Sequence, residues 1–224
     1  MKRIVLSVGS LYLAAFAAMA QDPVKLSPQE FKVEFENDRV RVLRTKRGAH
    51  QKVGMHEHPP YVVVSLTDLH IRVTGTDGNV QEVSRTAGGA AFSNAVRHFE
   101  ENLSDQPLEA ILIELKGSPA AATSFPLPLD PVTVDPKHHT VILENERVRV
   151  LRSVREPHAK IPMHEHPASV VVSLTDLNFV TALADGTTAV NRRTAGEAGW
   201  RDARKHAPEN QSDQQAVEIL TELK

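Results

Sequence analysis

Two groups of three histidines occur at the same spacing in this sequence of 224 residues. His56 and His58 are separated by one residue, and His98 follows forty residues after the second of them. The second group repeats this spacing with His164, His166 and His206. Histidines two apart on a strand point to the same face, and a third imidazole can close a facial metal site. The spacing therefore predicts two metal sites, one for each group.

The histidines lie within a duplication that covers most of the chain. Residues 22–116 align without a gap with residues 130–224, and 48 of the 95 aligned pairs are identical. This unit is too long for a solenoid repeat, whose period is roughly 20–50 residues, and it is long enough to bury a small core of its own. We expect two tandem domains, 22–116 and 130–224, joined by an extended linker at 117–129 that is rich in proline and alanine.

The first twenty residues have the pattern of a secretory signal peptide. Lys2 and Arg3 precede an apolar run that ends in Ala18-Met19-Ala20, the small-x-small pattern of a signal-peptidase site. We expect a signal peptide at 1–20, cleavage after Ala20 and a periplasmic or secreted protein. The apolar run is shorter than the ~20 residues of a spanning helix, which argues against an uncleaved anchor and against stable membrane insertion after cleavage. Cysteine is absent, which excludes disulfides.

The charge distribution narrows the class of partner. The 26 basic and 28 acidic residues are mixed along the chain and give a net charge of -2. A nucleic-acid surface would show clustered lysine and arginine, so we expect no nucleic-acid partner. The expected ligand is a small molecule.

Short strands separated by turns dominate both repeats. Residues 39–44 alternate arginine and valine, residues 62–64 are a β-branched run, and residues 111–113 lie in a closing strand. Asp77-Gly78 and Asp185-Gly186 are typical of tight hairpins. The sequence predicts an all-β protein built as a sandwich or a small barrel, in which the arginine-valine segment is a half-solvated edge strand or an interdomain strand.

The histidine motifs of both repeats resemble those of the cupin superfamily. His56-x-His58-Pro59 followed by His98-x-x-x-Asn102, with Gly88 ten residues before His98, is similar to the two cupin motifs, and the second repeat has them again. The resemblance implies a tandem bicupin, similar to quercetinase-type enzymes in architecture only. It also implies that each repeat is a double-stranded β-helix, or jelly-roll barrel, whose three histidines bind a divalent metal.

Two departures from the cupin pattern bear on the site. The family usually has a glutamate four or five residues after the second histidine, where this chain has Val62 and Val63. The site would then have three neutral imidazoles and two or three open positions. His50 and His158 stand where the first motif has glycine, and we interpret them as exposed turn residues rather than ligands.

Other polar residues near the histidines are not expected to be metal ligands. Glu57 and Glu165 alternate with ligands, so they should face away from the metal. Glu100 could face the pocket as a base in the first repeat only, because its counterpart is Pro208. Asn102 and its counterpart Asn210 are expected to fasten a turn. No general base is assigned.

The donor set limits the metal and the reaction. Three imidazoles favour a divalent transition metal, which could be iron, copper, nickel, zinc, cobalt or manganese. The leading hypothesis is an exported bicupin that acts on a small anionic or enolisable compound as a dioxygenase, with an isomerase as a second reaction class. The alternative is a non-catalytic periplasmic module that binds a small ligand or a metal. A decayed pocket, in which the histidines only hydrogen-bond one another, is a further alternative.

The duplication also bears on assembly. By the family resemblance we expect the two barrels to form an intramolecular pseudo-dimer around a pseudo-twofold axis, with further oligomerisation possible.

Overall fold

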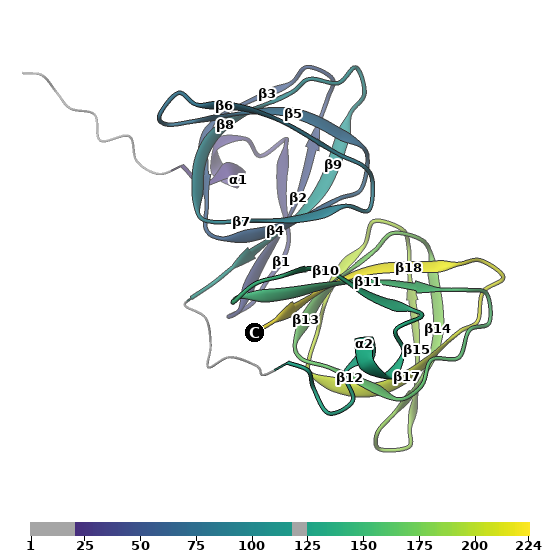
Figure 1. Ribbon diagram of the computed structural model, residues 1–224. Helices are drawn as coiled ribbons and strands as arrows, with labels where there is room; N and C mark the ends of the chain where they lie inside the picture. The colour runs from purple at the N-terminus through teal and green to yellow at the C-terminus, as the bar shows by residue number, and fades with distance from the viewer. Residues whose placement is uncertain (1–20, 118–124) are drawn as a thin grey trace, which may run out of the picture.

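The computed structural model describes residues 21–117 and 125–224, and its regular structure is almost entirely β-sheet (Figure 1). The expected all-β class is confirmed. The expected signal peptide at 1–20 and residues 118–124 of the expected linker lie outside the described residues.

The elements of the first half, here called the first barrel, are α1 (Pro23–Leu26), β1 (Phe31–Glu36), β2 (Val40–Arg47), β3 (Lys52–His58), β4 (Tyr61–Ser65), β5 (Leu69–Gly75), β6 (Val80–Arg85), β7 (Ala90–Ser93), β8 (Val96–Asn102) and β9 (Leu108–Leu115). Those of the second barrel are α2 (Pro131–Val134), β10 (His139–Glu144), β11 (Val148–Arg155), β12 (His164–His166), β13 (Ser169–Ser173), β14 (Leu177–Leu183), β15 (Thr188–Arg193), β16 (Ala198–Arg201), β17 (Arg204–Asn210) and β18 (Ala216–Leu223). Both helices are single turns, and no helix within the described residues is long and apolar enough to cross a bilayer.

Each barrel consists of two antiparallel sheets with the same strand order. In the first barrel, the five-stranded sheet has the order β1-β2-β9-β4-β7 and the four-stranded sheet has the order β3-β8-β5-β6. The second barrel repeats both orders with β10-β11-β18-β13-β16 and β12-β17-β14-β15. In both barrels the four-stranded sheet brings the strand with the paired histidines next to the strand with the third histidine.

The two Asp-Gly hairpins form where the sequence predicts them. Asp77-Gly78 connects β5 to β6, and Asp185-Gly186 connects β14 to β15. Gly78 and Gly186 have φ angles of 79° and 83°. These values lie in the left-handed region that glycine occupies without steric cost.

The β-branched runs follow from burial on both faces of the five-stranded sheets. Along β4, Val62 and Val64 face the other barrel, whereas Tyr61 and Val63 face the interior of their own barrel. Because successive side chains on a strand point to opposite faces, a strand buried on both sides is apolar at every position. This explains the uninterrupted valine run.

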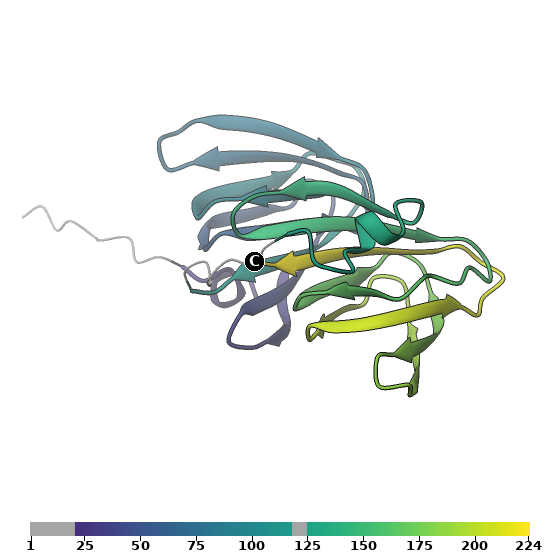
Figure 2. The same cartoon turned by 60° about the horizontal axis from the view of Figure 1, so that its bottom comes forward.

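The two barrels share one hydrophobic core. It joins buried valine, isoleucine and leucine side chains of β2, β4 and β9 with those of β11, β13 and β18. Both views show the barrels in contact along these sheets (Figures 1 and 2). The arginine-valine strands β2 and β11 are therefore not edge strands, because each has neighbours on both sides and lies between the barrels.

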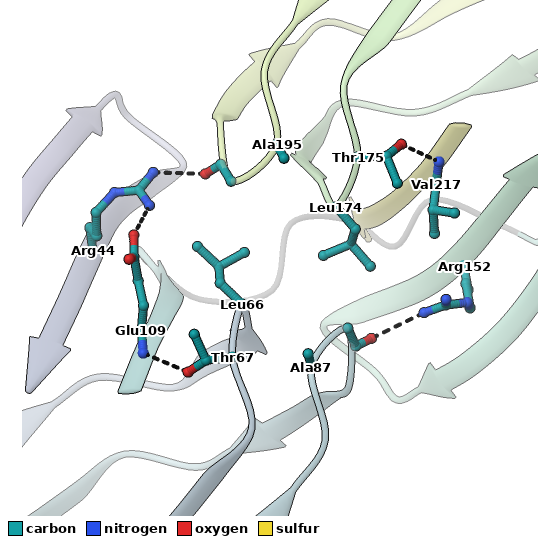
Figure 3. A pocket seen from close by; sticks show the side chains of 12 residues that line it. Arg44, Leu66, Thr67, Ala87, Glu109, Arg152, Leu174, Thr175, Ala195 and Val217 are labelled. Atoms are coloured by element: carbon teal, nitrogen blue, oxygen red, sulfur yellow. Dashed lines mark hydrogen bonds and ion pairs between the residues drawn. The ribbon is translucent and has the colours of Figure 1, made fainter. Parts of the chain in front are cut away.

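A cavity of about 460 Å³ lies between the barrels, and the contacts across it are reciprocal (Figure 3). The Arg44 guanidinium donates to the Gly196 carbonyl at 2.7 Å, and Arg152 donates to the Gly88 carbonyl at 3.4 Å. Gly88 and Gly196 have φ angles of 76° and 85°, so both positions favour glycine. The glycine of the second motif thus serves the contact between barrels.

Candidate metal centres

The structure brings the first three histidines together inside the first barrel. His56 and His58 come from β3, and His98 on β8 is the direct cross-strand partner of His56. All three side chains are buried, and one ring nitrogen of each lies within 4.8 Å of the others. The expected register of the two motifs produces this cluster.

The ring nitrogens of this cluster are arranged to accept a cation. The Nδ1 of His56 donates to the Gly54 carbonyl at 2.8 Å, which leaves its Nε2 with a lone pair. That Nε2 lies 3.2 Å from the Nε2 of His98. Two imidazole ligands about 2.0–2.1 Å from one metal in tetrahedral or octahedral geometry place their nitrogens about 2.9–3.4 Å apart. The observed separation fits a shared metal ion, and it is also that of a direct hydrogen bond between the two rings.

The second barrel also places its three expected histidines on two neighbouring strands. His164 and His166 come from β12, and His206 on β17 is the cross-strand partner of His164. The His206 ring centroid lies 4.5 Å from that of His164 and 5.4 Å from that of His166. All three side chains are buried.

A fourth histidine, which the sequence motifs did not indicate, joins the second cluster. His139, at the start of β10, is 1% exposed, and one of its ring nitrogens lies within 4.8 Å of ring nitrogens of His164 and His166. His206 does not belong to this group of mutually close nitrogens, although its ring centroid lies 4.5 Å from that of His164. Its counterpart in the first barrel is Phe31, whose ring lies 5.4 Å from that of His56. The only sequence signal for His139 is this difference between the repeats.

A carboxylate supports one histidine of each cluster. The Nδ1 of His58 donates to Glu114 at 2.7 Å, and Arg41 reaches both Glu114 and Asp22. The same chain in the second barrel runs from His166 to Glu222 at 2.6 Å, then to Arg149 and Asp130. A carboxylate on Nδ1 fixes the tautomer that presents Nε2 to a metal. These supporting residues are identical in the two repeats, which is the signal that could have revealed them.

Glu100 faces the first cluster. Its carboxylate oxygens lie 3.8 Å from the Nε2 of His56 and 3.9 Å from that of His98, and Arg47 forms a buried ion pair with it. Burial raises the pKa of Glu100, but Arg47 and the nearby histidines outweigh this and lower the pKa to about 2. An ionised carboxylate therefore lies beside the imidazoles of the first barrel, whereas Pro208 holds this position in the second.

A cavity of about 320 Å³ opens onto the first cluster. Most of its wall is apolar, with Leu69, Ile71 and Leu112 among the lining residues. Tyr61, Arg85, His98 and Glu100 are polar lining residues. Burial raises the pKa of Tyr61 to about 12, so its hydroxyl remains a donor. Within the described residues no carboxylate pairs with Arg85, whose guanidinium can receive an anionic group.

The interior of the second barrel carries larger charged side chains at equivalent positions. Arg201 and Glu218 replace Ser93 and Ala110, which line the cavity of the first barrel. Glu218 accepts from Arg155 at 2.6 Å and from Arg201 at 2.9 Å. Glu218 and Arg155 are 0% and 1% exposed. A buried ion network thus occupies positions whose counterparts line the cavity of the first barrel.

Burial lowers the pKa of imidazoles in both clusters. It lowers the pKa of His56 to about 4, and it lowers that of His98 as well. In the second barrel it lowers the pKa of His164 to about 3 and that of His139 to about 2, and His206 shifts in the same direction. Neutral imidazoles are the form that binds metal ions.

The exposed histidines of the first motif are turn residues, as expected. His50 and His158 have φ angles of 55° and 57°, and each ring contacts an aspartate, Asp105 or Asp213. They lie outside both clusters. The left-handed backbone explains why the family motif has glycine there.

The two asparagines fasten turns, as expected. The glutamates between the paired histidines lie outside the clusters. Asn102 donates to the carbonyls of Gly48 and Gln106, and Asn210 makes equivalent bonds. Glu165 accepts from the backbone of Leu129 at 2.9 Å. Glu57 is half-buried and, like Glu165, alternates with two cluster histidines along its strand. None of these four residues belongs to a cluster.

Comparison with solved structures identifies the architecture. AerE from Microcystis aeruginosa matches 92% of this chain and 97% of its own, with a TM-score of 0.67 and 14% identity. An oxalate decarboxylase of Bacillus subtilis matches 83% of this chain and 69% of its own, with a TM-score of 0.60 and 11% identity. A related decarboxylase structure belongs to a study of the Mn(II) centres of that enzyme.

A shorter protein and two sequence comparisons complete this picture. A cupin domain from Bordetella pertussis Tohama I is 27% identical over 39% of this chain and 92% of its own, with a TM-score of 0.37. No protein-family profile matches the chain, and no curated protein sequence does so. The two-barrel similarities establish the fold alone, which is that of a bicupin with two cupin barrels in tandem.

Proposed function

We propose that the chain is a metal-dependent enzyme whose first barrel acts on a small anionic or enolisable compound, with dioxygenation as the reaction. The observation that carries this proposal is the cavity of about 320 Å³, which reaches His98 and Glu100 in the first barrel. A catalytic metal site needs an open side for substrate, and a ligand pocket is mostly apolar with a few directed polar groups. The first barrel meets both requirements.

The buried donors support a metal ion at both clusters. In the second barrel the Nε2 atoms of His139, His164, His166 and His206 have no hydrogen-bond partner among residues 21–117 and 125–224. Leaving a buried polar atom unpaired costs about 1–3 kcal/mol, so several such atoms in one cluster favour a bound cation. In the first barrel, His56, His58 and His98 would hold a divalent transition metal.

Glu100 would be the fourth donor of the first site. Its carboxylate lies at similar distances from two of the histidine nitrogens, and Arg47 orients it. It takes the place of the glutamate that the first motif lacks, but it comes from β8 rather than β4. Its negative charge would offset part of the charge of the ion.

Arg85 and Tyr61 would recognise the substrate. Both side chains line the cavity, where Arg85 can pair with an acidic group and Tyr61 can donate to an oxygen atom. The apolar wall, including Leu69 and Ile71, would hold the body of the compound and exclude water. These features favour a compound with one anionic end and an apolar remainder.

The bound ion would polarise an oxygen atom of the substrate and favour its anionic form. Dioxygen is the co-substrate that the reaction requires, and both of its atoms enter the organic product. The protein's own side chains bind and orient the compound and keep the site dry. We also propose, from the sequence pattern at 1–20 that is typical of a signal peptide, that the protein acts in the periplasm or outside the cell.

The second barrel favours a second candidate function, namely metal binding without turnover. Its interior is filled by the network of Arg155, Glu218 and Arg201, which leaves less room for a substrate. If the first barrel also lacks activity, the chain would be a metal-binding or ligand-binding module.

Oxygen uptake tests the proposed function. Metal-free protein is loaded separately with Fe(II), Mn(II), Co(II), Ni(II), Cu(II) or Zn(II) and assayed with flavonols, β-diketones and phenolic acids. We expect turnover with at least one ion, loss of turnover in His98→Ala, and retention of most of it in His206→Ala. Binding of metal and compound without oxygen consumption for any ion would contradict a dioxygenase, and the absence of any chemical change in the compound would support the binding module.

A further inference from the structure

We propose that the second barrel holds a closed metal site of four imidazoles, in which His139 is the fourth ligand, and that this site takes a borderline ion of the zinc or copper kind. This inference rests on the proposed metal binding by the histidine clusters. It concerns a residue outside the two sequence motifs, and it makes the two barrels chemically different.

The position of His139 is that of a ligand. Its ring centroid lies 5.0 Å from that of His164 and 6.1 Å from that of His166. Its Nδ1 faces the Asp135 carbonyl at 3.2 Å, so Nδ1 carries the proton and Nε2 keeps its lone pair. That Nε2 is buried and unpartnered.

Hydrogen bonds also place the proton of His164 and His166 on Nδ1. The Nδ1 of His164 donates to the Pro162 carbonyl at 2.8 Å, and that of His166 donates to Glu222. Among the described residues, the Nε2 atoms of both histidines have no partner, and His206 has none at either ring nitrogen. Unprotonated, buried lone pairs that face one another repel unless a cation lies between them. The nitrogens of His139, His164 and His166 lie within 4.8 Å of one another, and the His206 ring centroid lies 4.5 Å from that of His164, so the four imidazoles together point to a four-coordinate ion.

Phe31 shows that the fold does not require an imidazole at this position. It occupies the equivalent place in the first barrel, is 0% exposed, and packs against His56 and His58. A phenyl ring fills the same volume without a donor atom. The histidine of the second barrel thus adds a chemical function to a position that packing alone can satisfy.

The second site is closed, whereas the first is open. Arg155 lies over the Phe179 ring, with 5.0 Å from the guanidinium carbon to the ring centroid, and it joins Glu218 and Arg201 in the buried network. The equivalent region of the first barrel is the cavity. Structural metal sites have four protein ligands and no open position, whereas catalytic sites keep one open. The second site has the features of a structural site.

The donor set selects the class of metal. The second site offers only imidazole nitrogens, and the positive charges of Arg155 and Arg204 act on His164 and His206. Such a site binds an ion through the preference of imidazole nitrogen for that metal more than through electrostatic attraction. Imidazole donors suit zinc and copper, whereas carboxylate donors suit manganese. Glu100 gives the first site the oxygen donor that the second lacks.

Zinc release from the full chain tests the inference. Metal-free protein is loaded with Zn(II), and release to an excess of chelator is followed. We expect two equivalents, one released rapidly from the open first site and one slowly from the second. His139→Phe should accelerate the slow phase on the order of 100-fold, because the protein loses one ligand. His138→Phe is the matched control, since the His138 ring pairs with Asp135 and Glu156 and should not affect release.

The outcomes separate the inference from the proposed function. Two zinc equivalents with unchanged slow release in His139→Phe would overturn the role of His139 and leave the proposed function intact. Failure of the wild-type chain to bind any divalent ion would contradict the proposed function itself. If His139→Phe does not fold, His139→Gln takes its place. Loading with Mn(II) alone should fill one site, and retention of two equivalents of manganese would overturn the metal class.

Discussion

His58 donates a 2.7 Å hydrogen bond through Nδ1 to Glu114, a glutamate that lies 56 residues further along the chain. The second barrel repeats this bond between His166 and Glu222 at 2.6 Å. Each glutamate is buried and is held by an arginine of the neighbouring strand. The two repeats share this support and the three motif histidines, whereas neighbouring positions such as Glu100 and Pro208 differ, so the bond belongs to the common function of the two barrels.

Removing the charge of these glutamates should weaken metal binding. Glu114→Gln should lower the metal affinity of the first site by about 10–100-fold, and Glu222→Gln should do the same for the second, because the histidine loses its charged acceptor. Titration calorimetry with Zn(II) measures both affinities. Glu57→Gln is the control, since Glu57 alternates with the cluster histidines along β3. Equal affinities for Glu114→Gln and wild type would refute the supporting role.

Substrate recognition should depend on Arg85 and not on its counterpart. Arg85→Gln should raise KM by about 10–100-fold, since a hydrogen bond to a charged group contributes about 1.5–3 kcal/mol. Arg193→Gln changes the equivalent residue of the second barrel and should leave KM unchanged. Steady-state oxygen uptake with the substrate found by screening gives both values. A similar effect of the two substitutions would place the substrate elsewhere.

The ion network of the second barrel should be sensitive to loss of its only carboxylate. Glu218→Gln leaves Arg155 and Arg201 buried without a counter-charge, and this should lower the free energy of unfolding by about 3–5 kcal/mol. Urea unfolding of the metal-free protein measures the difference. A change below about 1 kcal/mol would mean that water, rather than Glu218, stabilises these arginines.

The contribution of Glu218 should also depend on pH. Burial raises the pKa of Glu218, but Arg201 and Arg155 lower it to about 2, below the ordinary value of 4.5. The folded state therefore binds fewer protons, and the stabilisation is present above pH 4.5 and is lost as the pH falls toward 2. The difference in unfolding free energy between wild type and Glu218→Gln should shrink over this range. A difference that is constant with pH would argue against an ionised Glu218.

The contact between barrels should be more sensitive at Gly88 than at other glycines with positive φ. A methyl group at Gly88 would lie 2.9 Å from both Arg152 and Leu174, whereas nothing lies within 4 Å of one at Gly78. Gly78→Ala should therefore cost only the backbone strain, about 1–2 kcal/mol. Gly88→Ala should cost more, because the Arg152 contact must also move. Thermal melting compares the variants, and equal losses would show that the contact between barrels tolerates the methyl group.

The sequence predicts the duplication, the all-β class and the clustering of histidines because these follow from identity at fixed spacing and from alternation along strands. His139 could not be found in this way, since its counterpart is Phe31 and neither residue belongs to a motif. The charged interior of the second barrel could not be predicted from the sequence either. The sequence shows that two equivalent pairs differ between the repeats, namely Ser93 and Arg201, and Ala110 and Glu218. Only the strand register shows that both positions face the barrel interior.

The most direct test of this account is anomalous X-ray diffraction from crystals of the full chain loaded with Zn(II). The account predicts one peak in each barrel, about 2.0–2.1 Å from the Nε2 atoms of His56, His58 and His98 in the first and of His139, His164, His166 and His206 in the second. Peaks at other positions, or histidine rings that turn away from one another with no peak between them, would contradict it.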